Sequence, residues 1–94
     1  MIKLNSAQIN SNLSNCSGWS YENESISKQF KFKDFIEALS FVNAVGLESE
    51  KMDHHPNILM FAWNNVKITI STHSAGGVTE KDFELAKKIE ERIK

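Results

Sequence analysis

The chain has 94 residues, of which 40% are hydrophobic and 24% are charged, and its formal net charge is −1. A chain of this length can build one hydrophobic core, so we predict a single domain that spans residues 1–94. Because the charge is nearly balanced and Arg92 is the only arginine, direct binding of nucleic acid is not expected.

Cys16 is the only cysteine, which excludes an internal disulfide. Its neighbours Asn15 and Ser17 offer no base that could activate the thiol, so we expect a small, partly buried side chain. The N-terminus lacks the long apolar region of a signal peptide, and the longest apolar run, residues 58–63, is too short to span a bilayer. We therefore expect a cytoplasmic protein that does not insert into a membrane.

The first third of the chain predicts a helix and a β-hairpin. Residues 6–13 begin with Ser6, a favoured N-cap residue, and place two apolar side chains four positions apart, which indicates a short helix. Residues 19–22 and 26–32 alternate apolar and polar side chains, as half-buried strands do. Residues 23–25 are Asn-Glu-Ser, which is typical of a turn, so the two strands are predicted to form a hairpin.

Residues 34–50 form the clearest predicted helix, and this helix is apolar on two sides. The two apolar lines are Phe35, Leu39 and Val42, which lead to Gly46, and Ala38, Phe41 and Val45. One face of a sheet can cover only one of these sides. Either the helix is deeply buried within the monomer, or it packs on the sheet with one side and on a second subunit with the other. The small size of the domain favours the second explanation.

A second hairpin is predicted over residues 58–73. Asn64-Asn65 separates two strand-like segments, residues 58–63 and 66–73, and asparagine tolerates the left-handed backbone of tight turns. In the later strand one face carries Ile68, Ile70 and Thr72, and the other carries Lys67, Thr69, Ser71 and His73.

Thr79-Glu80-Lys81-Asp82 is a variant of the capping box and predicts the start of a final helix. Cations gather near the C-terminal end of this helix, where they complement its macrodipole: Lys87, Lys88, Arg92 and Lys94. The predicted order of elements is therefore α-β-β-α-β-β-α. This order indicates an α+β fold, a two-layer sandwich in which a four-stranded antiparallel sheet carries helices on one face. The other face of the sheet stays free for a site or an interface.

The three histidines, His54, His55 and His73, fall within twenty residues of one another. Each alone would be read as an ordinary surface or core residue, but the predicted hairpin brings them to one edge of the sheet. Adjacent histidines in an extended segment point to opposite sides, no cysteine lies nearby, and the spacing matches no zinc motif, so a metal site is not expected. Acid–base catalysis is favoured, because imidazole can accept or donate a proton at neutral pH.

At these residues the sequence resembles the pterin-4a-carbinolamine dehydratase family, through an ordered set of motifs rather than one signature. These motifs are Gly18-Trp19, Phe30-Lys31-Phe32-Lys33-Asp34-Phe35, Glu50-Lys51-Met52-Asp53-His54-His55-Pro56, Trp63-Asn64-Asn65-Val66, Ser71-Thr72-His73, Gly76-Gly77-Val78-Thr79 and Asp82. The resemblance implies an enzyme that dehydrates 4a-hydroxytetrahydrobiopterin to quinonoid dihydropterin, in tetrahydrobiopterin recycling, without a metal or cofactor. It also implies a homodimer or homotetramer that assembles through the sheet edge and the central helix.

The resemblance further implies roles for individual residues. His54 and His73 would be the acid–base pair, His55 would hold the substrate and assist, and Asp82 would orient an imidazole. The implied substrate-binding residues are Asp53, His54, His55, Pro56, Ser71, Thr72, His73 and Ser74, with Glu50 as a further candidate for the wall of the site. Asp82 could also be a plain helix cap, and Glu50 a solvated residue at a helix end.

Two rival interpretations remain at this stage. Some members of the family act as dimerisation cofactors of a homeodomain transcription factor, so the chain could be a non-catalytic protein-binding module. The sequence also departs from the family pattern by one extra residue between His-His-Pro and Thr-His, and it lacks an aromatic residue near Ile58, so the chain could instead be a structural homologue with degraded activity. Because an extra residue reverses the facing of a strand unless a bulge absorbs it, we predict a bulge or a longer loop within residues 57–61.

Overall fold

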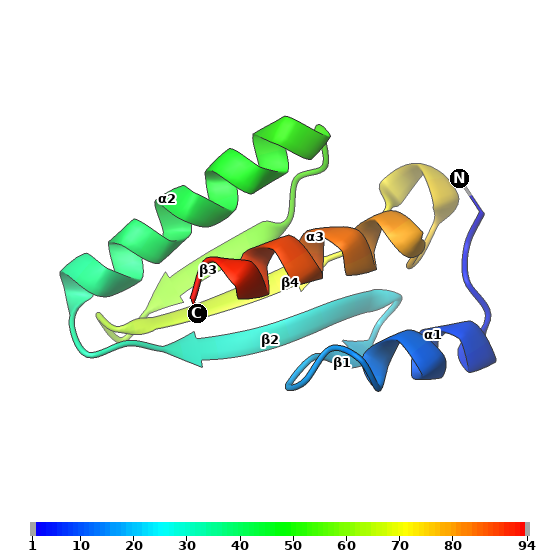
Figure 1. Cartoon of the computed structure of the whole chain (residues 1–94), viewed down its shortest axis with the longest axis horizontal. Helices are drawn as coiled ribbons and strands as arrows, with labels where there is room; N and C mark the ends of the chain where they lie inside the picture. Colours follow the sequence, from blue (N-terminus) through cyan, green and yellow to red (C-terminus); the bar gives the residue numbers. More distant parts are fainter. Residues whose placement is uncertain (1, 94) are drawn as a thin grey trace.

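The computed structural model describes residues 2–93 and arranges them around one antiparallel sheet (Figure 1). Its strands are β1 (Ser20–Glu22), β2 (Ser25–Lys31), β3 (Asn57–Phe61) and β4 (Asn65–Ile70), in the spatial order β1-β2-β4-β3. The helices are α1 (Ser6–Leu13), α2 (Phe35–Met52) and α3 (Glu80–Glu91), and a short 3₁₀ helix, η1 (His73–Ala75), precedes α3. The α+β class and the order of elements confirm the prediction. Lys94, expected near the end of the last helix, and Met1 lie outside the described residues.

The core lies between one face of the sheet and the helices α2 and α3, which are green and orange in Figure 1. Strand β4 is central and buries alternate side chains, Val66, Ile68 and Ile70. The helices contribute Ala38, Phe41 and Val45 from α2, and Phe83, Leu85, Ala86 and Ile89 from α3. The other face is polar, because the register pairs Ser27 with Thr69 and Gln29 with Lys67. The sheet is therefore covered by helices on one face, as predicted.

Local capping sets the helix boundaries. Helix α1 begins after Asn5 rather than Ser6, because Asn5 and Gln8 exchange backbone and side-chain hydrogen bonds, each of 2.9 Å. Helix α3 begins after Thr79 with the predicted capping box. Helix α2 continues to Met52 and ends where Asp53 adopts a left-handed backbone with φ of 50°. No helix within residues 2–93 has the length and apolar character needed to cross a bilayer.

The turn between β3 and β4 lies earlier than predicted. Phe61 pairs with Asn65, so residues 62–64 form the connection, and Ala62 and Trp63 take the left-handed backbone expected for Asn64-Asn65. Asn64 is instead used for a tertiary contact: its buried side-chain amide donates to the Phe32 carbonyl at 2.7 Å, and its own carbonyl accepts from the Phe32 amide at 2.9 Å. A contact with a distant segment thus overrides the local turn preference of asparagine.

The predicted bulge within residues 57–61 was wrong. Strand β3 pairs with β4 without interruption from Asn57 opposite Thr69 to Phe61 opposite Asn65. The three-residue turn, rather than the strand, is where an extra residue fits without reversing the facing of β3. Strand β4 also ends sooner than predicted, at Ile70, because His73 begins the helix η1 instead of continuing the strand.

Replacing Asn64 with Ala should lower the free energy of unfolding by about 1–3 kcal/mol, because the substitution removes the buried hydrogen bond to the Phe32 carbonyl. Chemical denaturation measures this change. Asn10→Ala, at an exposed position of α1, is the control and should change stability by less than about 0.5 kcal/mol. Equal stability of the two variants would show that the contact does not hold the turn.

Candidate active site

The three histidines meet at one end of the sheet, as the sequence predicts. Residues 53–55 follow α2, residues 71–74 follow β4, and together they enclose a hollow of about 330 Å³. This volume is at the lower end of the range for small-molecule sites. The hollow is lined by Asp53, His54, His55, Ser71, Thr72, His73, Ser74 and Lys81.

Three predicted site residues do not line the hollow itself. Asp82 lies beneath it and is completely buried. Glu50 lies on the last turn of α2, where its carboxylate bonds His55 Nε2. Pro56 is half-buried and immediately precedes β3. Among the residues of the hollow, sequence reasoning missed only Lys81, which belongs to the first turn of α3.

The end of α2 determines how the two adjacent histidines face. The left-handed Asp53 turns the chain so that its amide bonds the Glu50 carbonyl at 3.2 Å and the His54 amide bonds the Ser49 carbonyl at 3.0 Å. As a result His54 is 9% exposed and points inward, while His55 is exposed and bonds Glu50 near the surface. The two imidazoles therefore lie in different surroundings, one in the protein interior and one at the surface.

Asp82 is the centre of a buried polar network. Its Oδ1 is 2.5 Å from His54 Nε2, and its Oδ2 accepts from the Thr72 hydroxyl at 2.9 Å and from the Thr79 amide at 2.8 Å. This contact orients His54, and it suits the tautomer that carries a hydrogen on Nε2, because a carboxylate offers only acceptors. Its bond to the Thr79 amide also caps α3, so both roles considered for Asp82 coexist.

His73 differs from His54 in its surroundings. It starts η1, and its side chain is exposed at the hollow. Within residues 2–93 no side-chain hydrogen bond or ion pair holds its imidazole. The hollow thus combines one anchored imidazole and one free imidazole, which is an arrangement suited to transferring protons to and from a bound substrate.

Other chemistries have less support in the described part of the chain. No group of three or more His, Cys, Asp and Glu side chains in residues 2–93 is arranged to hold a metal ion. Cys16 is buried away from the histidines, and burial raises the pKa of its thiol above the ordinary value. A raised pKa leaves little thiolate, so Cys16 is a poor nucleophile.

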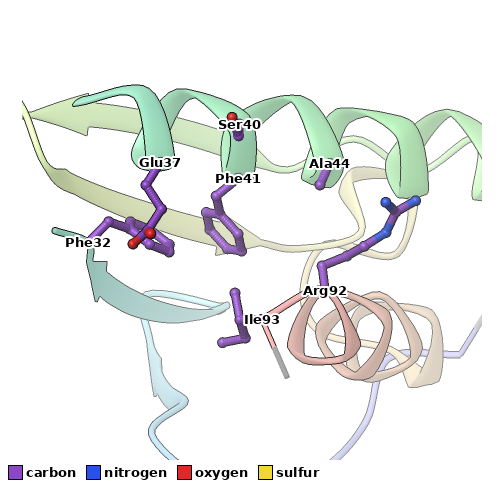
Figure 2. A pocket seen from close by; sticks show the side chains of 7 residues that line it. All are labelled: Phe32, Glu37, Ser40, Phe41, Ala44, Arg92 and Ile93. Carbon is purple, nitrogen blue, oxygen red and sulfur yellow. The ribbon is translucent and has the colours of Figure 1, made fainter. Parts of the chain in front are cut away.

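A second hollow, of about 430 Å³, lies between α2 and the chain that follows α3 (Figure 2). The rings of Phe32 and Phe41 and the side chain of Ile93 point into it. Its charged residues are Glu37 and Arg92, and Arg92 is already paired with Glu48 at 2.7 Å. This hollow lacks an acid–base pair, so the histidine hollow is the better candidate for catalysis.

Comparison with known proteins points to one family. A model of the pterin 4 alpha carbinolamine dehydratase family matches residues 2–92. A protein from Sulfolobus acidocaldarius, provisionally named as a pterin-4-alpha-carbinolamine dehydratase, is 50% identical over 88 residues, which are 94% of this chain and 96% of that protein. A protein from Trichormus variabilis with the same provisional name is 46% identical over 86 residues, covering 92% and 91% of the two chains. A crystal structure from Brucella melitensis, described as a transcriptional coactivator/pterin dehydratase, has a TM-score of 0.89 at 40% identity and covers 95% of this chain and 96% of that one.

Replacing Thr72 with Val should lower the free energy of unfolding by about 1–3 kcal/mol, because Asp82 loses one of its hydrogen-bond donors inside the core. Urea denaturation measures this loss. Thr69→Val, on the polar face of the sheet, removes the same hydroxyl group without touching Asp82 and should change stability far less. If both variants were equally stable, the Thr72–Asp82 bond would contribute nothing to the network.

Proposed function

Because the chain belongs to the pterin 4 alpha carbinolamine dehydratase family, we propose that it removes water from 4a-hydroxytetrahydrobiopterin to give quinonoid dihydropterin. The observation that carries this proposal is the hollow with three imidazoles, one of them held by the buried Asp82 carboxylate. In a cell this reaction would return a spent hydroxylase cofactor to the recycling pathway of tetrahydrobiopterin.

The reaction needs one base and one acid. A proton leaves a ring nitrogen, the electron pair of that N–H bond forms a C=N bond, and the C4a–O bond breaks as the hydroxyl leaves with a proton as water. We assign these proton transfers to His54 and His73, since both line the hollow. Asp82 is a positioning residue, which keeps the hydrogen of His54 Nε2 directed to itself while the other ring nitrogen of His54 exchanges a proton with the substrate.

The remaining polar groups of the hollow would bind the flat ring. Asp53 offers a carboxylate to the amino edge of the pterin, and Ser71, Thr72 and Ser74 offer hydroxyl and backbone groups. His55 would contact the substrate from the exposed side, and its bond to Glu50 would limit the positions of its imidazole. Pro56 would act on the backbone of its neighbour His55, because the residue before a proline is restricted to extended conformations. This restriction would set the direction in which the chain enters β3.

We further propose that the protein is a homodimer or homotetramer that uses α2. Ala38, Phe41 and Val45 of α2 face the core, whereas Phe35 and Leu39 of the other apolar line are 49% and 39% exposed. Ile36 and Leu47 on the same helix are 68% and 57% exposed. An apolar line of this kind is costly in water and is typical of an interface.

The same exposed line of α2 supports a second candidate function, as a binding surface for a different protein. The Brucella melitensis relative is described as both a transcriptional coactivator and a pterin dehydratase. A non-catalytic binding module would keep the α2 surface and would not need the histidines. The two functions are therefore separated by substitutions in the histidine hollow.

The decisive experiment measures the dehydration of 4a-hydroxytetrahydrobiopterin, generated by a coupled hydroxylase, in the presence of a chelator. Turnover well above the spontaneous rate and insensitive to the chelator is expected, because the proposed proton transfers use side chains alone. A rate equal to the spontaneous one would overturn the dehydratase proposal and favour the protein-binding module.

In the same assay, His73→Ala should lower turnover by about 10²–10⁴-fold, the usual contribution of one acid–base group. The variant should keep its fold, because His73 is exposed and lies outside the core. Gln29→Ala, on the polar face of the sheet, is the control and should keep full activity. Unchanged turnover in His73→Ala would show that the acid–base assignment is wrong.

Leu39→Glu should shift the protein from oligomer to monomer, because the substitution places a charge in the exposed apolar line of α2. Size-exclusion chromatography with light scattering measures the mass of the particle. Asn10→Glu introduces a new negative charge at an exposed polar position of α1, away from the apolar line of α2, and should leave the mass unchanged. A wild-type protein that is monomeric at all concentrations would refute the proposed assembly.

A further inference from the structure

A third hollow adjoins the histidine hollow. It measures about 440 Å³, lies between α2 and α3, and is lined by Glu48, Lys51, Met52, Lys81, Glu84 and Lys88. Lys81 lines both hollows, and Met52 is followed directly by Asp53, which lines the histidine hollow. A molecule bound among the histidines could therefore extend past Lys81 into this space, which we call the lysine groove.

The lysine groove keeps positive charge that the protein itself does not neutralise. Glu48 is bound by Arg92 at 2.7 Å, which holds the pKa of its carboxyl below the ordinary value, and it lies 3.8 Å from Lys51. Within residues 2–93 neither Lys81 nor Lys88 forms an ion pair. The groove is lined by three lysines and two carboxylates, Glu48 and Glu84, and Arg92 also pairs with Glu48, so a net positive charge remains.

The position of Lys81 is not explained by the stability of the fold. It is in the first turn of α3, where the helix macrodipole disfavours a cation. The residue is only partly exposed and lines both hollows, so its side chain lies at the boundary between them. A lysine without an ion pair, at the junction of the histidine hollow and a basic groove, indicates a site for an anion.

We propose that the lysine groove binds the phosphate of a pterin whose C6 side chain is phosphorylated, with Lys81 closest to the ring. This inference rests on the proposed function, because it assumes that the ring occupies the histidine hollow. Lysine ammonium groups bind phosphate as point charges from several directions, which suits Lys51, Lys81 and Lys88 around one groove. The substrate class is thus a phosphorylated pterin rather than one with a neutral side chain.

Calorimetric titration with two probes, 7,8-dihydroneopterin and its monophosphate, tests this proposal. The phosphorylated probe should bind about tenfold more tightly, the effect of one hydrogen bond between charged groups, and the preference should decrease as salt increases. Lys81→Met should bring the ratio of the two dissociation constants close to one, and Lys81→Glu should reverse it. Lys87→Met, on the same helix but outside the groove, should keep the wild-type ratio.

The outcomes separate this inference from the proposed function. Equal affinity of the wild-type protein for the two probes would overturn the phosphate site and leave the dehydratase proposal standing. No binding of either probe, together with no dehydration of 4a-hydroxytetrahydrobiopterin, would remove both. Inorganic phosphate that bound as tightly as the phosphorylated pterin would also overturn the inference, because the ring would then contribute nothing. Thermal unfolding of each variant confirms that the ratios come from folded protein.

Discussion

The buried carboxylate of Asp82 is the interaction on which the rest of the site depends. Placing a carboxylate in a core is costly unless hydrogen bonds replace the lost water, and Asp82 has three such partners. These partners come from three separate segments: the loop after α2, the chain after β4, and the residue that caps α3. One group therefore ties the start of a helix to both segments that supply the histidines. The interactions that hold the fold together at this end also hold the arrangement of the proposed catalytic residues.

This shared role explains how the hollow can be open to solvent while one of its imidazoles, that of His54, is held in a fixed position. His54 lines it but is anchored from beneath, whereas His73 and His55 stand at the surface. A proton-transfer site needs one group whose tautomer is fixed and another that can exchange protons with solvent. The chain reaches this division where α2 ends at the left-handed Asp53, which is followed by the buried His54 and the exposed His55.

The sequence predicts the architecture well because the architecture follows from local patterns. The alternation in β2 and β4, the helical spacing in α2 and the capping box at Thr79 each act over a few residues, and each is confirmed. The misplaced turn between β3 and β4 arose where a distant segment competes with local preference. Asn64 contacts Phe32 instead of forming the turn, so the left-handed positions moved to Ala62 and Trp63.

For the candidate site, the sequence predicts which residues lie close together, and their roles stay a prediction. The grouping of His54, His55 and His73 follows from hairpin topology, and the bond between Asp82 and His54 fits the role implied by the family resemblance. Lys81 could not be found in this way, because its importance arises from the packing of α3 against α2, which opens one hollow into another. The one local signal was a lysine in the first turn of a helix, where the macrodipole disfavours it.

Helix α2 connects the two proposed activities of the protein. Its exposed apolar line includes Phe35 and Leu39 near its beginning, while its last turn carries Glu50 and leads directly into Asp53 and His54. Helix α2 has 18 residues and moves as one rigid element, so a contact that fixes its first half also fixes its last turn. A second subunit packed on the exposed line would therefore fix the end that supplies His54. Self-association would then do more than cover apolar surface, since it would also restrict the position of the catalytic loop.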